Sequence, residues 1–198
     1  MERVHAMTDT QPSGRLRSLA FFGDSLTADG SWDEWFPDYS THNLGGAGET
    51  TDDLLDRLDA LVDAKPDAVA LLIGTNDLSM RRSVEHVVRN AELLLVNMRR
   101  DLPGTRTLVQ SIMPRSREFS EQIQDANRHL RQFSPTVHAQ YLDLWPALAV
   151  DDELNPAFTD DGLHLNAAGY DAWLGELRPA IERLEDVPPM SRPISVIP

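Results

Sequence analysis

The sequence predicts an α/β domain in three layers, with helices covering both faces of a parallel β-sheet. Three observations support this fold class. The chain has 198 residues, of which 41% are hydrophobic and 25% charged, a composition typical of one globular domain with its own core. Short apolar segments alternate with longer amphipathic ones, as in consecutive βαβ units. The sequence shows no internal repeat, and no linker rich in proline and glycine divides the middle of the chain.

Four short apolar segments are predicted to form the strands of this sheet. They cover residues 19–22, 68–73, 107–112 and 139–144. Central strands of a parallel sheet are buried on both faces, so they are expected to be apolar throughout instead of alternating with polar residues. The segments at residues 19–22 and 68–73 fit that pattern throughout, and the other two fit it in part.

Four helices are predicted from apolar residues that recur at spacings of three and four. These stripes cover residues 54–62, 84–98, 123–133 and 170–184. Thr50 or Thr51 is expected to cap the first helix and Asn166 the last, while Pro103 and Gly104 end the second. Each stripe needs a sheet or another helix to cover it.

The charge balance and the missing residue types exclude several classes of partner and site. With 32 acidic and 18 basic residues, the chain has a formal charge of -14, so nucleic acid and anionic membranes are not expected partners. It has no cysteine, which excludes a disulfide framework, a thiol nucleophile and thiolate metal ligands. None of the six histidines has the spacing of a helical metal-binding pair, and we therefore expect no metal ion.

The two ends of the chain differ in composition from the part between them. Residues 1–15 are polar and without periodicity, and residues 188–198 are rich in proline, so both are predicted to be disordered tails around one domain at residues 16–187. The sequence shows no apolar run long enough to cross a membrane and no signal peptide. We therefore expect a cytoplasmic protein, while the oligomeric state stays open.

A serine lies where the first predicted strand turns into a helix. The segment Gly23-Asp24-Ser25-Leu26-Thr27 would hold the Ser25 hydroxyl at the carboxyl edge of the sheet, where ligands of α/β proteins bind. Such a serine is a nucleophile if a base reaches it, but serine is also a common helix cap at these turns. The segment alone leaves both interpretations open.

An aspartate and a histidine lie three residues apart just before the last predicted helix. This spacing allows the Asp161 carboxylate to reach Nδ1 of His164, which would leave Nε2 free to act as a base. The fold would then have to supply only one long-range contact, between His164 and Ser25. Taken alone, the pair fits equally well an aspartate in a turn and a histidine packed at a helix start.

Two loops offer hydrogen-bond donors for a developing oxyanion. In residues 43–50, glycines permit the backbone to approach a substrate closely, and in Gly74-Thr75-Asn76-Asp77 the Asn76 amide donates without adding charge. Each loop alone is more often structural. It is the combination of four such segments, in this order, that points to acyl transfer.

The four segments resemble the four motif blocks of the SGNH, or GDSL, hydrolase family, and the resemblance covers about residues 16–184. It implies a flavodoxin-like sheet, no cofactor, and a catalytic triad of Ser25, Asp161 and His164. It also implies an oxyanion hole formed by the backbone amides of Ser25 and Gly48 and the side chain of Asn76. Residues 109–114 and 166–170 are similar to the small acetylhydrolase branch of the family, whereas Glu49 stands where relatives often have aspartate.

The resemblance implies a serine esterase that cleaves short-chain carboxylic esters, acetyl esters foremost, through an acyl-serine intermediate. Its partner would be a small-molecule ester. The same residues would serve an acyltransferase or a thioesterase, and a catalytically silent binding module on this fold is the alternative from another class. The complete set of site residues argues against the silent module.

Aromatic residues follow the nucleophile segment closely. Trp32, Trp35 and Phe36 would either wall an acyl or alcohol site or form a satellite cluster over the edge of the sheet. Met113, directly after the apolar segment at residues 107–112, is a further candidate for the same pocket, although methionine is more often core filler.

Overall fold

The computed structural model describes residues 15–187, so the predicted tails, residues 1–14 and 188–198, lie outside the described part. Its centre is a sheet of five parallel strands in the order β2-β1-β3-β4-β5. The strands are β1 (Ser18–Gly23), β2 (Ser40–Gly45), β3 (Ala68–Leu72), β4 (Arg106–Gln110) and β5 (Gln140–Leu142). This order is that of flavodoxin-like sheets, which confirms the predicted fold class.

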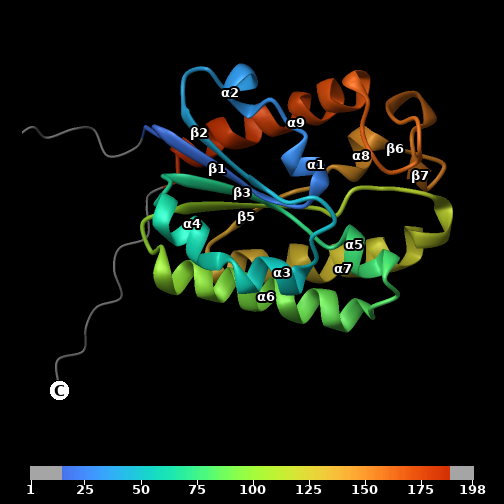
Figure 1. Ribbon diagram of the computed structural model, residues 1–198, viewed down its shortest axis with the longest axis horizontal. Helices are drawn as coiled ribbons and strands as arrows, with labels where there is room; N and C mark the ends of the chain where they lie inside the picture. The colour runs from blue at the N-terminus through green and yellow to red at the C-terminus, as the bar shows by residue number, and fades with distance from the viewer. Residues whose placement is uncertain (1–14, 188–198) are drawn as a thin grey trace, which may run out of the picture.

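Helices cover both faces of the sheet (Figure 1). On one side lie α1 (Ser25–Ala28), α2 (Trp32–Trp35), α8 (Trp145–Leu148) and α9 (Ala167–Glu185). On the other lie α3 (Thr51–Asp56), α4 (Leu58–Ala64), α6 (Val84–Asp101) and α7 (Ser120–Phe133), with the short α5 (Thr75–Ser79) at the end of β3. The remaining elements are a two-stranded hairpin of β6 (Ala149–Val150) and β7 (Glu153–Leu154) and the 3-10 turns η1 (Arg117–Phe119), η2 (Ser134–Val137) and η3 (Pro156–Phe158).

The two faces of β1 feed two different hydrophobic clusters. Leu19 and Phe21 pack in the cluster that contains Trp173 and Leu177 of α9, whereas Ala20 and Phe22 pack in the cluster formed with α3, α4 and α6. Successive side chains of a strand point to opposite faces, so one apolar run serves both layers. A third cluster lies between α6 and α7.

Besides several short helices and the β6–β7 hairpin, for which no prediction was made, the structure differs from the predicted elements at two places. β2 was not predicted, because it is an edge strand whose sequence, SerThrHisAsnLeuGly, is mostly polar and only partly buried. The first predicted helix is two helices, α3 and α4, with the break at Arg57, whose backbone is not helical. Asn166 does cap α9, since its Oδ1 accepts a hydrogen bond from the Gly169 amide at 3.1 Å.

Within residues 15–187, none of the helices combines the length and the apolar character needed to cross a membrane.

Candidate active site

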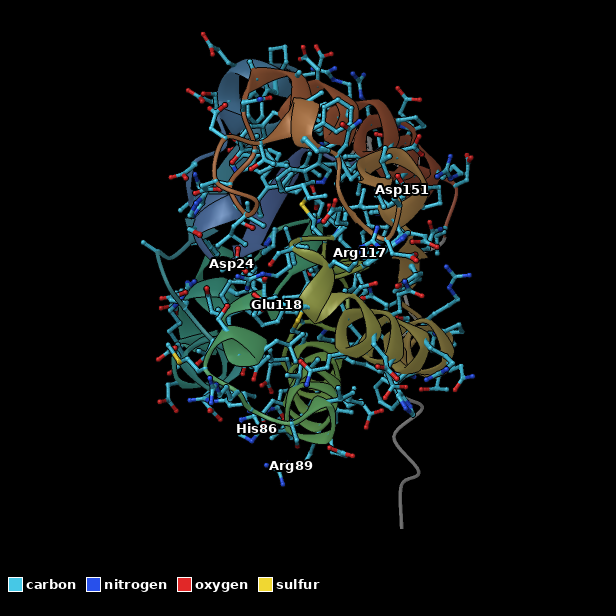
Figure 2. The ribbon with its side chains drawn as sticks, turned by 90° about the vertical axis from the view of Figure 1, so that its right-hand side faces the viewer. Asp24, His86, Arg89, Arg117, Glu118 and Asp151 are labelled. Carbon is cyan, nitrogen blue, oxygen red and sulfur yellow. The ribbon has the colours of Figure 1, made fainter. Side chains whose placement is uncertain are left out.

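Strand order brings three of the four sequence segments to one edge of the sheet. Ser25 follows β1, Gly48 follows β2 and Asn76 follows β3, and these are three neighbouring strands in the order β2-β1-β3. The carboxyl ends of parallel strands meet at the same edge, so the residues that follow them are close in space although they are far apart in sequence. Figure 2 faces this edge, with Asp24 labelled beside the end of β1.

Ser25 is the first residue of α1, a single helical turn held in place at both ends. The Asp24 carboxylate caps the helix by accepting a hydrogen bond from the Leu26 amide at 3.0 Å. At the other side, the Tyr170 hydroxyl of α9 donates to the Leu26 carbonyl at 2.8 Å. The serine hydroxyl is therefore presented from a turn that is anchored to both β1 and α9.

Ser25, His164 and Asp161 form a continuous hydrogen-bonded series. Ser25 Oγ lies 3.2 Å from His164 Nε2, and His164 Nδ1 lies 2.7 Å from Asp161 Oδ2. The first contact joins residues 139 positions apart in sequence. With its proton on Nδ1 donated to Asp161, the imidazole offers the Nε2 lone pair to the serine hydroxyl, which is the arrangement of a general base and its nucleophile.

Asp161 is held as an anion by its own loop. Its Oδ1 accepts hydrogen bonds from the backbone amides of Leu163 at 2.9 Å and His164 at 2.7 Å. The hydrogen bond from the His164 side chain, supported by these amides, holds the pKa of this carboxyl well below its usual range. The local spacing thus fixes both the orientation of the imidazole and the charge that stabilises its protonated form.

The glycine loop and the Asn76 turn lie against each other beside Ser25. Gly48 has φ +75°, a conformation that L side chains rarely adopt, and a Cβ there would meet no atom within 4 Å, so the requirement for glycine is conformational. Asn76 Nδ2 donates to the Glu49 carbonyl at 2.8 Å. An amide nitrogen carries two hydrogens, so the second remains available to an oxyanion.

Asp77 joins the Asn76 turn to the start of α3, which directly follows the glycine loop. It is fully buried, and its carboxylate accepts hydrogen bonds from the Thr51 amide at 2.9 Å and from Thr51 Oγ1 at 2.7 Å. Asp77 was not singled out from the sequence. The signal available was its place directly after Asn76, where a buried carboxylate must find donors in the neighbouring loop.

A cluster of metal-ligand type lies behind this turn. Asp52, Asp77 and His86 bring potential ligand atoms within 4.8 Å of one another. However, Arg82 Nη1 lies 3.2 Å from Asp77 Oδ1 and also pairs with Asp52, so a guanidinium already forms ion pairs with both carboxylates. We therefore interpret the cluster as an ion-pair network that supports α5.

The aromatic residues after Ser25 pack in or against the hydrophobic core, which is the second of the two interpretations offered above. Trp32 is 1% exposed and Phe36 is 4% exposed. Trp32 stacks on Phe21 with ring centroids 3.9 Å apart and meets Trp173 edge-on at 5.2 Å. Trp35 packs partly buried against the same cluster, and Met113 is 3% exposed in it. These side chains belong to the core because α9 covers this face of the sheet.

A hollow of about 280 Å³ lies beside the loop that carries Asp161 and His164. Its lining mixes charged, polar and apolar residues: Arg115, Ser116, Glu153, Leu154, Pro156, Thr159, Asp160 and Gly162. The segment after β4 and the β6–β7 hairpin form its wall, joined by a hydrogen bond from Arg117 Nη2 to the Asp151 carbonyl at 2.7 Å (Figure 2). Arg115 in turn contacts the Asn76 turn, since its Nη1 lies 3.3 Å from the Thr75 carbonyl.

Comparisons with known proteins place this geometry in a family. The model of the GDSL-like lipase/acylhydrolase family matches residues 21–172. This chain belongs to that family. Membership assigns the domain to the carboxylic ester hydrolases, and it confirms the resemblance drawn from the four sequence segments.

Other proteins are similar to this GDSL-family domain in sequence or in fold. A structure from Streptococcus pneumoniae described as a platelet activating factor has a TM-score of 0.74 at 26% identity, over 88% of this chain and 86% of that one. A GDSL-like lipase structure from Bacteroides thetaiotaomicron has a TM-score of 0.71 at 21% identity, over 84% and 88% of the two chains, and shows the same fold. An N-acylneuraminate cytidylyltransferase of Streptococcus agalactiae is 27% identical over 158 residues, 79% of this chain. The match spans 37% of the length of that curated relative.

Burial of Asp24 in this GDSL-family domain makes its stability depend on pH. Asp24 is 1% exposed, and burial raises its pKa to about 7. A carboxyl that binds its proton more tightly when folded stabilises the fold fully below its unfolded pKa, and this stabilisation is lost as pH rises through the folded pKa. Over a shift of about three units the loss is at most about 4 kcal/mol.

We expect the Asp24→Asn variant to lack this loss, because asparagine keeps a capping oxygen and does not ionise. Its free energy of unfolding, measured with urea between pH 4.5 and pH 8, should rise relative to that of the wild type by several kcal/mol, on the order of 1.4 kcal/mol per pH unit in the middle of the range. Asp59→Asn, a charge removed from an exposed position, is the control and should give a curve parallel to the wild type. Parallel curves for Asp24→Asn would show that Asp24 ionises as readily in the fold as outside it.

Proposed function

We propose that this protein hydrolyses short-chain carboxylic esters, acetyl esters foremost, through an acyl-serine intermediate. The observation that carries the proposal is the series from Asp161 through His164 to Ser25, at 2.7 and 3.2 Å, next to the two loops that carry Gly48 and Asn76. The His164 side chain is 45% exposed, so a substrate can approach the series from solvent.

The geometry supports a two-step reaction. His164 Nε2 takes the proton of Ser25 as Oγ attacks the ester carbonyl, and Asp161 stabilises the imidazolium that results. The amides of Ser25 and Gly48 and the side chain of Asn76 hold the oxyanion. As the tetrahedral intermediate collapses, His164 gives its proton to the leaving alcohol, and the acyl group stays on Ser25.

Water then completes the reaction by the same route. His164 takes a proton from the water molecule that attacks the acyl-serine carbonyl, and the second tetrahedral intermediate releases the carboxylic acid as the proton returns to Ser25 Oγ. Ester and water are thus consumed, alcohol and carboxylic acid are released, and Ser25 and His164 return to their starting protonation states.

The preference for short acyl groups rests on the surroundings of Ser25. The apolar side chains that follow it, Trp32 and Phe36 above all, are packed in the core, and the hollow beside the His164 loop has charged side chains, Arg115, Glu153 and Asp160, in its lining. A long acyl chain would therefore lie against solvent and recover only part of the roughly 0.8 kcal/mol that each buried methylene contributes.

A series of p-nitrophenyl esters from acetate to dodecanoate, used below their micelle concentrations, tests the proposal. We expect kcat/KM for acetate and propionate to be at least equal to that for octanoate, because the longer chain adds no transition-state binding. Ser25→Ala measured in parallel gives the spontaneous rate to subtract. A kcat/KM that climbs steadily to dodecanoate would show a long acyl site and overturn the short-chain assignment.

A further inference from the structure

Arg57 lies at the break between α3 and α4 and contacts three segments of the active-site edge. Its Nε donates to Glu49 Oε2 at 2.8 Å in the glycine loop. Its Nη2 donates to the Leu44 carbonyl at 2.8 Å in β2 and to the Gly23 carbonyl at 3.2 Å at the end of β1, and it also pairs with Glu49. One guanidinium therefore ties the nucleophile strand, the neighbouring edge strand and the glycine loop together.

Glu49 extends this connection to the third oxyanion donor. Its backbone carbonyl accepts the hydrogen bond from Asn76 Nδ2 at 2.8 Å, and Gly48 directly precedes it. Ser25 lies two residues after the carbonyl that Arg57 holds. The Arg57–Glu49 pair therefore lies close to each of the three donors assigned to the oxyanion. Glu49 directly follows Gly48 and is hydrogen-bonded to Asn76, and Arg57 holds the carbonyl two residues before Ser25.

The surroundings leave little freedom for the pair. A Cβ on residue 46 would lie 2.0 Å from the carboxyl carbon of Glu49, so glycine at this position makes room for the carboxylate. The guanidinium lies 4.8 Å from the centroid of the Phe22 ring. The two side chains are only 26% and 23% exposed, so their geometry is more fixed than that of a surface ion pair.

We propose that Arg57, acting through Glu49, is a positioning residue that sets Gly48 and Asn76 at the correct distance from Ser25. The inference rests on the proposed ester hydrolysis. Oxyanion donors must lie about 3 Å from the oxygen that becomes charged, and a displacement of about 1 Å can cost about 100-fold in rate. Loss of the pair should therefore weaken binding of the transition state and leave binding of the ester nearly unchanged.

Position and charge can be separated at this residue. Arg57→Lys keeps the positive charge, but a single ammonium lacks the planar fork that reaches Glu49, Leu44 and Gly23 at once. If the guanidinium acted only through its charge, lysine would preserve the rate. If it acts by holding the loops, lysine should lose most of it.

The experiment compares Arg57→Ala, Arg57→Lys and Arg131→Ala with the wild type. Arg131 is a matched control, since it also pairs with a carboxylate, Asp143, and lies over an aromatic ring, Tyr141 at 5.3 Å, but belongs to α7 away from Ser25. For p-nitrophenyl acetate, we expect kcat of both Arg57 variants to fall roughly 10- to 100-fold with KM within about twofold. Arg131→Ala should keep its kcat, and the melting temperature of each variant shows how much stability the change costs.

Addition of guanidinium chloride at millimolar concentration distinguishes a lost guanidinium contact from a general loss of structure. Only the first can be restored by a free guanidinium ion. It should restore part of the kcat of Arg57→Ala, by about threefold or more, and have no such effect on Arg131→Ala. Sodium chloride at equal concentration controls for ionic strength.

The inference is overturned if Arg57→Ala and Arg57→Lys keep kcat within about threefold of the wild type, or if guanidinium restores nothing. Should Arg57→Ala fail to fold, Arg57→Lys decides by its kcat and KM alone. Wild-type turnover in the same assay separates this failure from that of the proposed function. A wild type without turnover on any ester would remove the function first and the positioning role with it.

Discussion

Replacing Ser25 by alanine should reduce ester turnover at least about 10⁴-fold, because the acyl group then has no oxygen to which it can be transferred. His164 would lose its contact with the Ser25 hydroxyl at 3.2 Å, while its hydrogen bond to Asp161 would persist. What turnover remains should come from the oxyanion donors acting on a bound ester and water. Steady-state hydrolysis of p-nitrophenyl acetate measures the change.

The fold should tolerate this substitution, since the Ser25 side chain is only partly buried and α1 is capped by Asp24 rather than by the serine. Ser40→Ala, an exposed serine of β2, is the control and should keep full turnover. A fluorophosphonate probe should label the wild type at Ser25 and leave Ser25→Ala unlabelled. If the alanine variant keeps more than about one hundredth of wild-type turnover with an unchanged melting temperature, Ser25 is not the nucleophile.

Replacing Asn76 by alanine should lower kcat by about 10²- to 10³-fold and change KM within about twofold. The reason is that the amide donates more strongly to an oxyanion than to the neutral carbonyl of the bound ester. The same change removes the hydrogen bond to the Glu49 carbonyl, which anchors the glycine loop. A kcat measurement with the acetate ester, together with the affinity for a boronic acid as tetrahedral analogue, tests the role.

Asn127 provides the matched control for a lost asparagine. Its side chain bonds both the amide and the carbonyl of Ile112 at 2.8 Å, and it is 8% exposed. Asn127→Ala should therefore cost stability without a comparable loss of kcat in the folded fraction. An Asn76→Ala variant that binds ester more weakly at unchanged kcat would exclude Asn76 from the oxyanion hole.

The hydrogen-bonded pair of Asp161 and His164 was predictable because its geometry is local. Three residues separate the two, and the intervening amides of the same loop fold onto the carboxylate. The turns that carry Ser25 and Asn76 were equally predictable from the sequence, since each directly follows an apolar strand. Where a side chain interacts within a few residues of itself, spacing and residue type carry the information.

Contacts between segments that are far apart in the sequence could not be predicted in the same way. The sequence showed neither β2, whose polar edge strand lacks an apolar pattern, nor the role of Arg57, which interrupts an otherwise regular helical stripe. The aromatic residues at 32, 35 and 36 could equally have lined a site or filled the core. Packing of α9 on that face of the sheet decided for the core.

By itself, the sequence determined the layered α/β class, the order of the strand and helix segments it could see, and the residue types at the carboxyl ends of β1 and β3. The tertiary structure alone decided that β2 lies beside β1, that His164 reaches Ser25 across 139 residues, and that Arg57 and Asp77 join the loops around them. The physical reason is that hydrophobic periodicity specifies which side of an element is buried, but not which element covers it. That choice is made only when strand order and packing are fixed together.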